Sequence, residues 1–376
     1  MKDDIRQGQL LMLIIVVISG GKFLSLPGVM AGMAGRDSWI AMCLLFAADL
    51  VCLACMLLAL GINKEGLDIN EIFCRSLTKP VAKALFLLYA VFFFTRVTGG
   101  MLDVLELVSS SLSVVTNWVA FALPTLAVIT FMAVKGLRNI GRVTQIFFIF
   151  IFASVLLILL LSVGHTDFGG LKPTLSGGFG KVLDCAFNVN FWFSDGVFLL
   201  FLAGRVKTGK AFFAKTTGAF LLGAALTVCL DVVFLALFGN LARYAVSALS
   251  KVSGFNITGS VYGRLDWVFI VLWMSSVIIK TTLFLWAASA GVEYALGISG
   301  RNARLAVFCV MSLIIIVLPL VFPMEEVVRR VFCEGWGKYV TAAAQYAVPL
   351  VSPLLVYAAN KKTARAKTPE TAEDGV

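Results

Sequence analysis

Ten ionisable residues lie within or at the edge of long apolar stretches, where a charge is costly: Lys22, Asp49, Arg96, Asp103, Glu106, Asp184, Asp195, Asp231, Lys280 and Glu293. On insertion scales a charge at the centre of a bilayer costs about 2.5–3.5 kcal/mol. Such side chains must face a cavity or pair with one another. The mixture of lysine, arginine and carboxylate therefore predicts buried ion pairing and the binding of a charged group.

Two sets of these residues share a helical face. Arg96, Gly99, Asp103 and Glu106 are spaced by three or four residues, as one side of a helix requires. This spacing fits a polar strip along a water-accessible interior, and equally ion pairs within one helix near the outer interface.

Trp273, Ser276 and Lys280 form the second set, and Lys280 falls in the middle of its apolar stretch. We expect Lys280 to face a cavity. Its candidate partners are Asp195, or else Asp49 and Asp231.

Lys22 follows two glycines that interrupt the first apolar stretch. A cation there can pair with an internal carboxylate or with the carboxylate of a substrate, and it can occupy a place that a coupling sodium ion would fill. Two lysines near one site, Lys22 and Lys280, disfavour sodium by like-charge repulsion. They favour coupling to protons, or no coupling.

Metal and nucleophile chemistry have little support. Most of the eight cysteines lie in apolar runs, and Cys52 and Cys55, spaced as C-x-x-C, lack a second pair of ligands. The only histidine, His165, is distant. We expect no metal site, no cofactor and no catalytic triad, and hence no enzyme.

The composition places these residues in a membrane. Of 376 residues, 60% are hydrophobic and 14% charged, and the mean hydropathy is +0.96. Soluble chains are about half apolar and about a quarter charged. The sequence predicts one membrane-embedded unit, with a first apolar run that is retained as a helix and not cleaved as a signal peptide.

Ten apolar segments are long enough to cross a bilayer, which takes about 20 residues. They are 10–34, 39–60, 84–111, 118–134, 142–163, 182–204, 211–239, 266–291, 304–322 and 339–359. We expect an all-α transmembrane domain over residues 1–360 and a disordered, polar tail over 361–376. The stretches 61–80 and 240–264 are expected to be polar loops.

The distribution of positive charge predicts the orientation. With ten spans, Lys and Arg are roughly twice as frequent on the side that holds both termini as on the opposite side. Because positive loops stay inside, both termini are expected in the cytoplasm. The net charge of +10 is thus chiefly a topology signal and not a sign of nucleic-acid binding.

Two segments have polar, glycine-containing interruptions near their middle, at 20–22 and 191–196. They are the first and sixth of the ten, which are corresponding members of two five-helix halves. Paired interruptions of this kind indicate a transporter-like site between inverted repeats. Two ordinary glycine kinks are the alternative interpretation.

Several stretches, in this order along the chain, resemble the spore germination permeases. They are Gly20-Gly21-Lys22-Phe23-Leu24-Ser25-Leu26-Pro27, 37–40, 136–142, 171–173 with 178–180, and 264–267 with Trp273. Members of that family are the B-subunits of nutrient germinant receptors, a branch of the amino acid/polyamine/organocation (APC) transporter superfamily.

The resemblance implies a five-plus-five inverted-repeat fold of the LeuT/APC type with broken helices 1 and 6. It also implies an amino acid or similar nutrient bound at the breaks, and assembly with a larger A-subunit and a lipoprotein C-subunit in the inner membrane of the spore. By position, the implied ligand-binding residues are Gly20, Gly21, Lys22, Phe23, Asn190, Trp192, Ser194, Asp195 and Gly196, with Arg96, Trp273 and Lys280 added from two further helices. Lys22 and Asp195 depart from the family pattern by adding charge.

Three functions are compatible with this interpretation of the sequence. The first is a receptor subunit in which nutrient binding triggers germination. The second is a proton-coupled amino-acid symporter of the same fold. The third is a membrane scaffold for the partner subunits, with a vestigial cavity.

Overall fold

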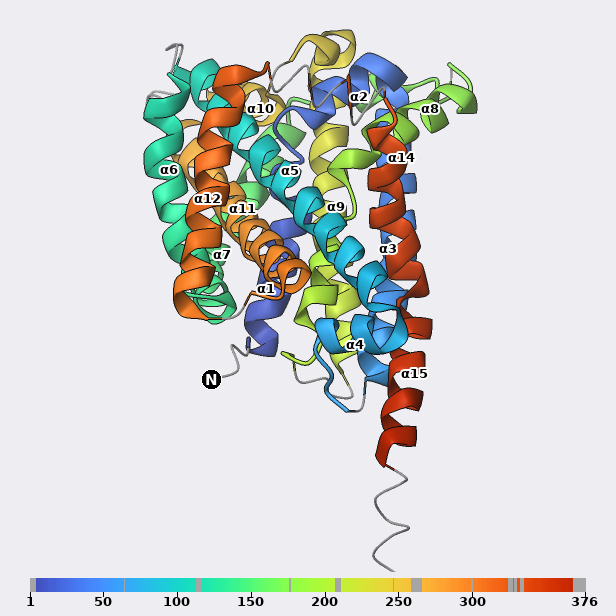
Figure 1. Ribbon diagram of the computed structural model, residues 1–376. Helices are drawn as coiled ribbons and strands as arrows, with labels where there is room; N and C mark the ends of the chain where they lie inside the picture. The colour runs from blue at the N-terminus through green and yellow to red at the C-terminus, as the bar shows by residue number, and fades with distance from the viewer. Residues whose placement is uncertain are drawn as a thin grey trace, which may run out of the picture.

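The computed structural model describes residues 5–63, 65–112, 117–175, 177–206, 211–245, 247–257, 266–298, 300–323, 327, 330–331 and 335–367. Within these ranges the chain is helical and contains no strand. Figure 1 shows the long helices side by side in a bundle, with the N-terminus at its lower end and the last helix extending below it.

The helices follow one another in a single bundle. The α-helices are α1 (Gln7–Ser19), α2 (Leu26–Ala34), α3 (Ser38–Ile62), α4 (Ile69–Ser76), α5 (Lys79–Leu112), α6 (Trp118–Val134), α7 (Leu137–Val163), α8 (Phe179–Val189), α9 (Phe212–Phe238), α10 (Ala248–Ile257), α11 (Asp266–Leu296), α12 (Arg301–Val321), α14 (Gly337–Ala342) and α15 (Val348–Lys367). The 3₁₀ turns are η1 (Gly35–Asp37), η2 (Phe168–Leu171), η3 (Asn190–Trp192), η4 (Asp195–Leu202) and η5 (Gly239–Tyr244), and η7 (Ala343–Ala347) is a π turn.

Every one of the ten expected segments contains helix, but the stretches expected as loops are not all irregular. Helix α4 lies within 61–80 and α10 within 240–264. The Asp68 side chain accepts from the Ile69 amide, and Glu71 accepts from the Asp68 amide. These caps, together with burial of Ile72 and Phe73, explain a helix too short and too polar to resemble a span.

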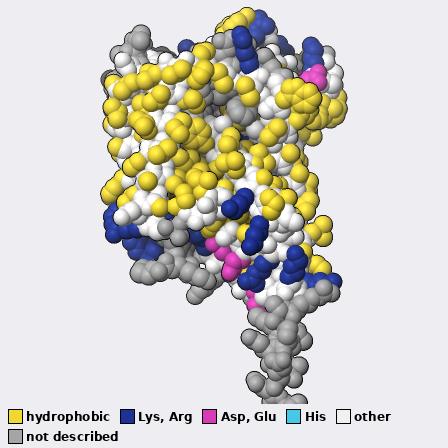
Figure 2. Space-filling model, in the orientation of Figure 1, with side chains coloured by type: hydrophobic (Ala, Val, Ile, Leu, Met, Phe, Trp, Pro, Cys, Tyr) yellow, Lys and Arg dark blue, Asp and Glu magenta, His cyan; other side chains and the backbone are white. Residues whose placement is uncertain are grey.

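The protein is a multi-pass membrane protein. Among the described residues, seven helical stretches are long and apolar enough to cross a bilayer, or up to eight if a bent pair counts as one span. Two further apolar helices, α1 and α6, are shorter, with 13 and 17 residues. Figure 2 shows apolar side chains over the broad middle of the visible face and lysine and arginine at both ends, more of them toward the lower end.

Two interruptions fall where the sequence places them. Helix α1 ends at Ser19 and α2 begins at Leu26, and between them Gly21 takes a left-handed φ of 84°. The second lies between the stretch Phe179–Trp192 and η4, whose axes differ in direction by 44°. There Ser194 is also left-handed, with a φ of 59°.

The helices that carry two of the candidate site residues, α5 and α11, approach each other closely at glycines. A β-carbon on Gly100 would lie 2.6 Å from Thr281 Cγ2, and one on Gly291 would lie 2.9 Å from the Phe86 carbonyl oxygen. Small residues let membrane helices pack at short range. This close approach fixes Arg96 on α5 relative to Lys280 on α11.

We expect Gly100→Ala to destabilise the protein by about 1–3 kcal/mol through overpacking against Thr281. Gly99→Ala is the matched control, because a β-carbon on that neighbouring residue has nothing within 4 Å. Unfolding of the two variants in detergent measures the difference. Equal midpoints would contradict the close contact of α5 with α11.

Candidate functional site

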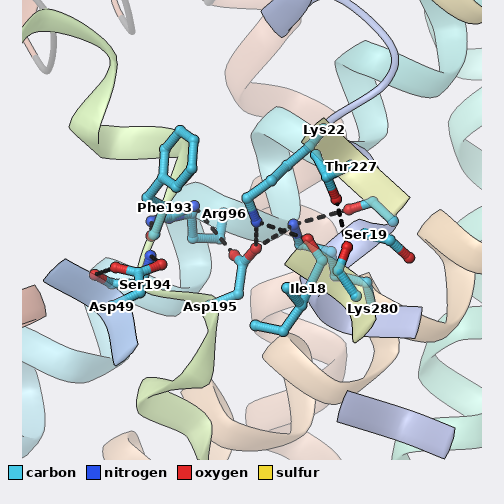
Figure 3. A network of polar contacts seen from close by, with 12 residues as sticks. Ile18, Ser19, Lys22, Asp49, Arg96, Phe193, Ser194, Asp195, Thr227 and Lys280 are labelled. Carbon is cyan, nitrogen blue, oxygen red and sulfur yellow. Dashed lines mark hydrogen bonds and ion pairs between the residues drawn. The ribbon is translucent and has the colours of Figure 1, made fainter. Parts of the chain in front are cut away.

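Asp195 is the centre of a buried charge cluster. Its Oδ2 accepts from the ammonium groups of Lys22 and, at 2.9 Å, Lys280, and its Oδ1 accepts from Arg96 Nη1 at 3.3 Å. Figure 3 shows the three cations converging on this one carboxylate. Lys22 and Asp195 are 0% and 1% exposed, and Arg96 is 7% exposed.

The interrupted backbone positions these cations. Lys22 Nζ also donates to the Ile18 carbonyl at 3.1 Å, Lys280 Nζ donates to the Gly20 carbonyl at 3.0 Å, and Arg96 Nη2 donates to the Phe193 carbonyl. Carbonyls at a helix end have no partner in their own helix. The cationic side chains supply the missing donors. The interrupted backbone therefore depends on the cations for its hydrogen bonds, and the buried cations depend on these carbonyls as acceptors.

All three cations share Asp195, because the nearby carboxylate of Asp49 accepts instead from the amide and the hydroxyl of Ser194, each at 2.8 Å. A buried charge is tolerated when it is paired and hydrogen-bonded. Arg96 Nε is buried and has no hydrogen-bond partner among the described residues, so the cluster retains a donor for a further anionic group.

Aromatic rings hold the cations in place. The Lys22 ammonium lies 5.4 Å from the centre of the Phe193 ring and 5.9 Å from that of Phe46. The Arg96 guanidinium lies 4.7 Å from the Phe191 ring. Such cation–π contacts stabilise desolvated cations by about 2 kcal/mol.

A small cavity adjoins the cluster. Its volume is about 40 Å³, and its lining includes Gly21, Lys22, Arg96, Asp103, Trp192 and Lys280. That space holds a water molecule, which needs roughly 10–15 Å³ on this measure, but it is too small for an amino acid. Ligand entry therefore requires movement of the surrounding segments.

The predicted strip on α5 is partly confirmed as a cavity wall. Arg96, Gly99 and Asp103 line this cavity together. Ser25, in the first interruption, donates its hydroxyl to Asp103 Oδ1 at 2.9 Å. A carboxylate beside the cations gives the cavity both signs of charge, as a zwitterion needs.

Some of the other predicted residues contribute a backbone carbonyl as a hydrogen-bond acceptor, and others contribute only side-chain packing. Gly20 contributes its carbonyl, and Asn190 accepts through its carbonyl from Gln345. Phe23 and Trp273 pack edge to face at 4.7 Å, with Trp273 0% exposed, and neither lines the cavity. A β-carbon on Gly196 would lie 3.8 Å from Met56 Cε.

Lys280 pairs with Asp195 and not with the other carboxylates considered, Asp49 and Asp231. Asp231 lies in α9, is 0% exposed, and neither of its carboxylate oxygens has a hydrogen-bond partner among the described residues. It is thus separate from the cluster. Nowhere in the described ranges do three His, Cys, Asp or Glu residues lie close enough to hold a metal ion.

Sequence reasoning missed Gln345. This side chain is 0% exposed, and its Nε2 lies 3.2–3.4 Å from the carbonyl oxygens of Asn190, Phe191 and Phe193. A lone amide within the apolar segment 339–359 was the available signal. The amide holds the second interruption through these backbone carbonyls.

A larger cavity lies toward the end of the bundle that holds the N-terminus. Its volume is about 730 Å³, and Asp68, Arg205, Trp286, Tyr294 and Arg304 line it. Next to the charge cluster lie four fully buried aromatic rings, whose contacts with one another span 5.4–6.3 Å between ring centres: Tyr89, Phe93, Phe201 and Phe284. The ring of Phe284 lies 5.6 Å from the Lys280 ammonium. Along α11, Phe284 lies between Lys280, which lines the small cavity, and Trp286, which lines the large one.

Comparison with known proteins gives a family and a fold. Residues 4–326 match the model of a family described as "Spore germination protein". No curated protein sequence matches the chain. Among solved structures, the crystal structure of MhsT in complex with L-phenylalanine is similar with a TM-score of 0.58 and 12% identity, over 94% of this chain and 98% of that one. MhsT is a transporter of the LeuT fold, and at this identity the similarity shows the fold alone.

Proposed function

Because the chain belongs to the spore germination protein family, we propose that it is the nutrient-binding membrane subunit of a spore germinant receptor. The observation that carries this proposal is the convergence of Lys22, Arg96 and Lys280 on Asp195 at two backbone interruptions. Ionisable residues inside a membrane bundle mark binding sites and relays, since burying them is otherwise costly.

The proposed ligand is an amino acid or a similar small molecule with a carboxylate. Its carboxylate competes with Asp195 for the cations, and Asp103 is the candidate partner for an ammonium group. MhsT, of the same fold, was crystallised with L-phenylalanine, and this supports the ligand class. Gly20, Gly21, Phe23, Asn190, Trp192, Ser194, Gly196 and Trp273 complete the proposed site and its supports.

We further propose ten spans arranged as five plus five, with α1–α2 and α8–η4 as the two broken members. The paired interruptions and the LeuT-fold neighbour support this count. The lysine and arginine side chains at the end that holds the N-terminus favour a cytoplasmic location for both termini (Figure 2). In this proposal the chain sits in the spore inner membrane with a receptor A-subunit and a lipoprotein C-subunit.

The site works as a sensor in this proposal. The small cavity is too small for an amino acid, so the interruptions must move for the nutrient to bind. Bound nutrient favours a second arrangement of the interruptions, and it shifts the equilibrium only by its difference in affinity for the two.

Equilibrium binding of each of the twenty radiolabelled L-amino acids to the full chain in lipid nanodiscs tests the ligand class. At least one is expected to bind saturably and to be displaced by its unlabelled form. Absence of saturable binding by all twenty, with and without the partner subunits, would contradict the proposal.

A proton-coupled symporter is the second candidate, and Asp231 favours it. A carboxylate that is 0% exposed and without a hydrogen-bond partner in the described structure is suited to carrying a proton. In proteoliposomes with an imposed pH gradient, the receptor proposal predicts little net uptake of the bound amino acid.

Asp231→Asn separates the two functions. The amide keeps the volume of the carboxyl group, so we expect ligand affinity to change less than about threefold and stability to change by less than about 1 kcal/mol. If the protein is a symporter, the same substitution abolishes pH-driven uptake. Robust uptake by the wild type and none by this variant would replace the receptor proposal with the symporter.

A further inference from the structure

We propose that Gln345 and the π turn around it form the output side of the ligand site. They pass a change in the second interruption to the C-terminal part of α15, at the end of the bundle that also holds the N-terminus and that we call the inner end. This inference rests on the proposed function, because it concerns how the same site is read. It goes beyond that function by naming the element that moves and the residues that connect it to the site.

The first link is the amide of Gln345. Its Nε2 is placed toward three carbonyls at the second interruption, those of Asn190, Phe191 and Phe193. The Phe193 carbonyl also accepts from Arg96, and Ser194 and Asp195 follow directly. Any movement of this segment away from the cations changes the hydrogen bonds of Gln345.

The second link is the helical register around Gln345. Residues Ala343–Ala347 form a π turn, in which each carbonyl pairs with the amide five residues on instead of four. In that register the Ala344 carbonyl would pair with residue 349, which is a proline without an N–H. The Tyr89 hydroxyl of α5 donates to this carbonyl instead, at 3.1 Å.

An α register would satisfy the same carbonyl differently. The Ala344 carbonyl would then accept from the amide of Val348, and the Tyr89 hydroxyl would lose its partner. The turn therefore has two discrete arrangements, and Tyr89 stabilises the π form. A two-state element of this kind is what physical coupling between distant sites requires.

The third link is α15 itself. It follows the π turn directly and runs along α3 to the inner end of the bundle, where it projects below the other helices (Figure 1). There Asn360 donates to the Ile62 carbonyl at 2.9 Å, and Arg75 of α4 donates to the Thr363 hydroxyl at 2.6 Å. A change of register at the π turn alters these contacts.

The size of the movement follows from helix geometry. Conversion of the π turn to the α register rotates the following helix by about 100° and shifts it by about 1.5 Å along its axis, which are the rotation and rise of one residue. At the surface of a helix 10–12 Å wide, a rotation of about 100° moves a side chain by roughly 8 Å. The exposed end of α15 is therefore where a partner would sense the state of the site.

The experiment measures that movement without needing a known ligand. Spin labels are attached through encoded p-acetylphenylalanine at Arg301 and Lys362, both exposed at the inner end, in the full chain in nanodiscs. Asp195→Asn loosens the second interruption. We expect it to produce a second population of label-to-label distances, shifted by several Å from the wild-type population. Tyr89→Phe, which removes only the hydroxyl that stabilises the π form, is expected to produce the same population.

Gln345→Ala is expected to abolish the effect of Asp195→Asn on this distance. Thr341→Ala is the matched control, because Thr341 is buried one turn earlier and its hydroxyl donates only within its own helix, to Gly337 and Lys338. An unchanged distance between the two labels in both Asp195→Asn and Tyr89→Phe would overturn the proposal. It would also be overturned if Asp195→Asn still shifted this distance after Gln345→Ala.

Failure of the proposed function gives a different result. If no amino acid binds but the shift depends on Gln345 as expected, the output element stands and the ligand assignment falls. If an amino acid binds and neither it nor Asp195→Asn moves α15, the ligand site stands and the output element falls.

Discussion

Asp195→Asn is expected to be the most destabilising single substitution in the site. Asparagine keeps the shape of the side chain but removes the one negative charge shared by Lys22, Arg96 and Lys280. Removing one partner of a buried ion pair costs about 3–5 kcal/mol, because the remaining charge is left uncompensated. Here three cations are left, so we expect a loss of at least that size.

The measurement is unfolding of the purified protein by titration with sodium dodecyl sulfate, followed by fluorescence of its seven tryptophans. Asp184→Asn is the matched control, since Asp184 is an exposed carboxylate on α8, about two turns before the same interruption. Equal stability of the two variants would show that the cations do not depend on Asp195.

A suppressor sharpens this result. Adding Lys280→Met to Asp195→Asn removes one of the cations left unpaired, so the double variant should be more stable than Asp195→Asn alone. Residues in one ion-pair network show such non-additive effects of 0.5–3 kcal/mol. A double variant less stable than either single variant would contradict the shared network.

The composition of the site was largely predictable from the sequence, and its geometry was not. Lys22 and Asp195 stand out because a charge in an apolar stretch has few explanations, and their partners Arg96 and Lys280 were found by the same criterion. That all three cations meet on one carboxylate depends on how four separate segments pack. Helical spacing within one segment carries no information on that packing.

The helical fold was predictable for the same reason, with two kinds of error. Segment lengths follow bilayer thickness, so the apolar runs identified the long helices, but short capped helices such as α4 escaped. Helix α15 continues to Lys367, into a stretch expected as tail, and residues 368–376 lie outside the described ranges. Polar residues do not stop a helix that is packed and anchored by contacts such as that of Asn360.

Gln345 shows the limit most clearly. A single amide in an apolar segment has no period and no motif, and its role appears only when the unwound carbonyls of residues 190–193 are placed beside it. The same holds for Asp49, whose partner Ser194 lies 145 residues away in sequence. Both residues support the second interruption from helices that sequence spacing does not connect to it.

Lys22→Met is expected to separate binding from stability, in contrast to Asp195→Asn. Asp195 keeps Lys280 and Arg96 as partners, and one of the three cations that share it, itself 0% exposed, is removed. The variant loses a donor to the Ile18 carbonyl, which costs about 1 kcal/mol. Loss of the buried charge offsets this cost, so stability should change by less than about 1 kcal/mol.

Ligand affinity should fall at least tenfold in the same variant. A hydrogen bond to a charged group is worth about 1.5–3 kcal/mol, or roughly 10–150-fold in affinity, and Lys22 is the cation placed at the first interruption. The affinity is measured with the amino acid identified in the binding screen, and Lys181→Met, an exposed lysine near the start of α8, is the control. Wild-type affinity in Lys22→Met would mean that the ligand's carboxylate is held by Arg96 or Lys280 alone, and the first interruption would then lose its proposed contact with the ligand.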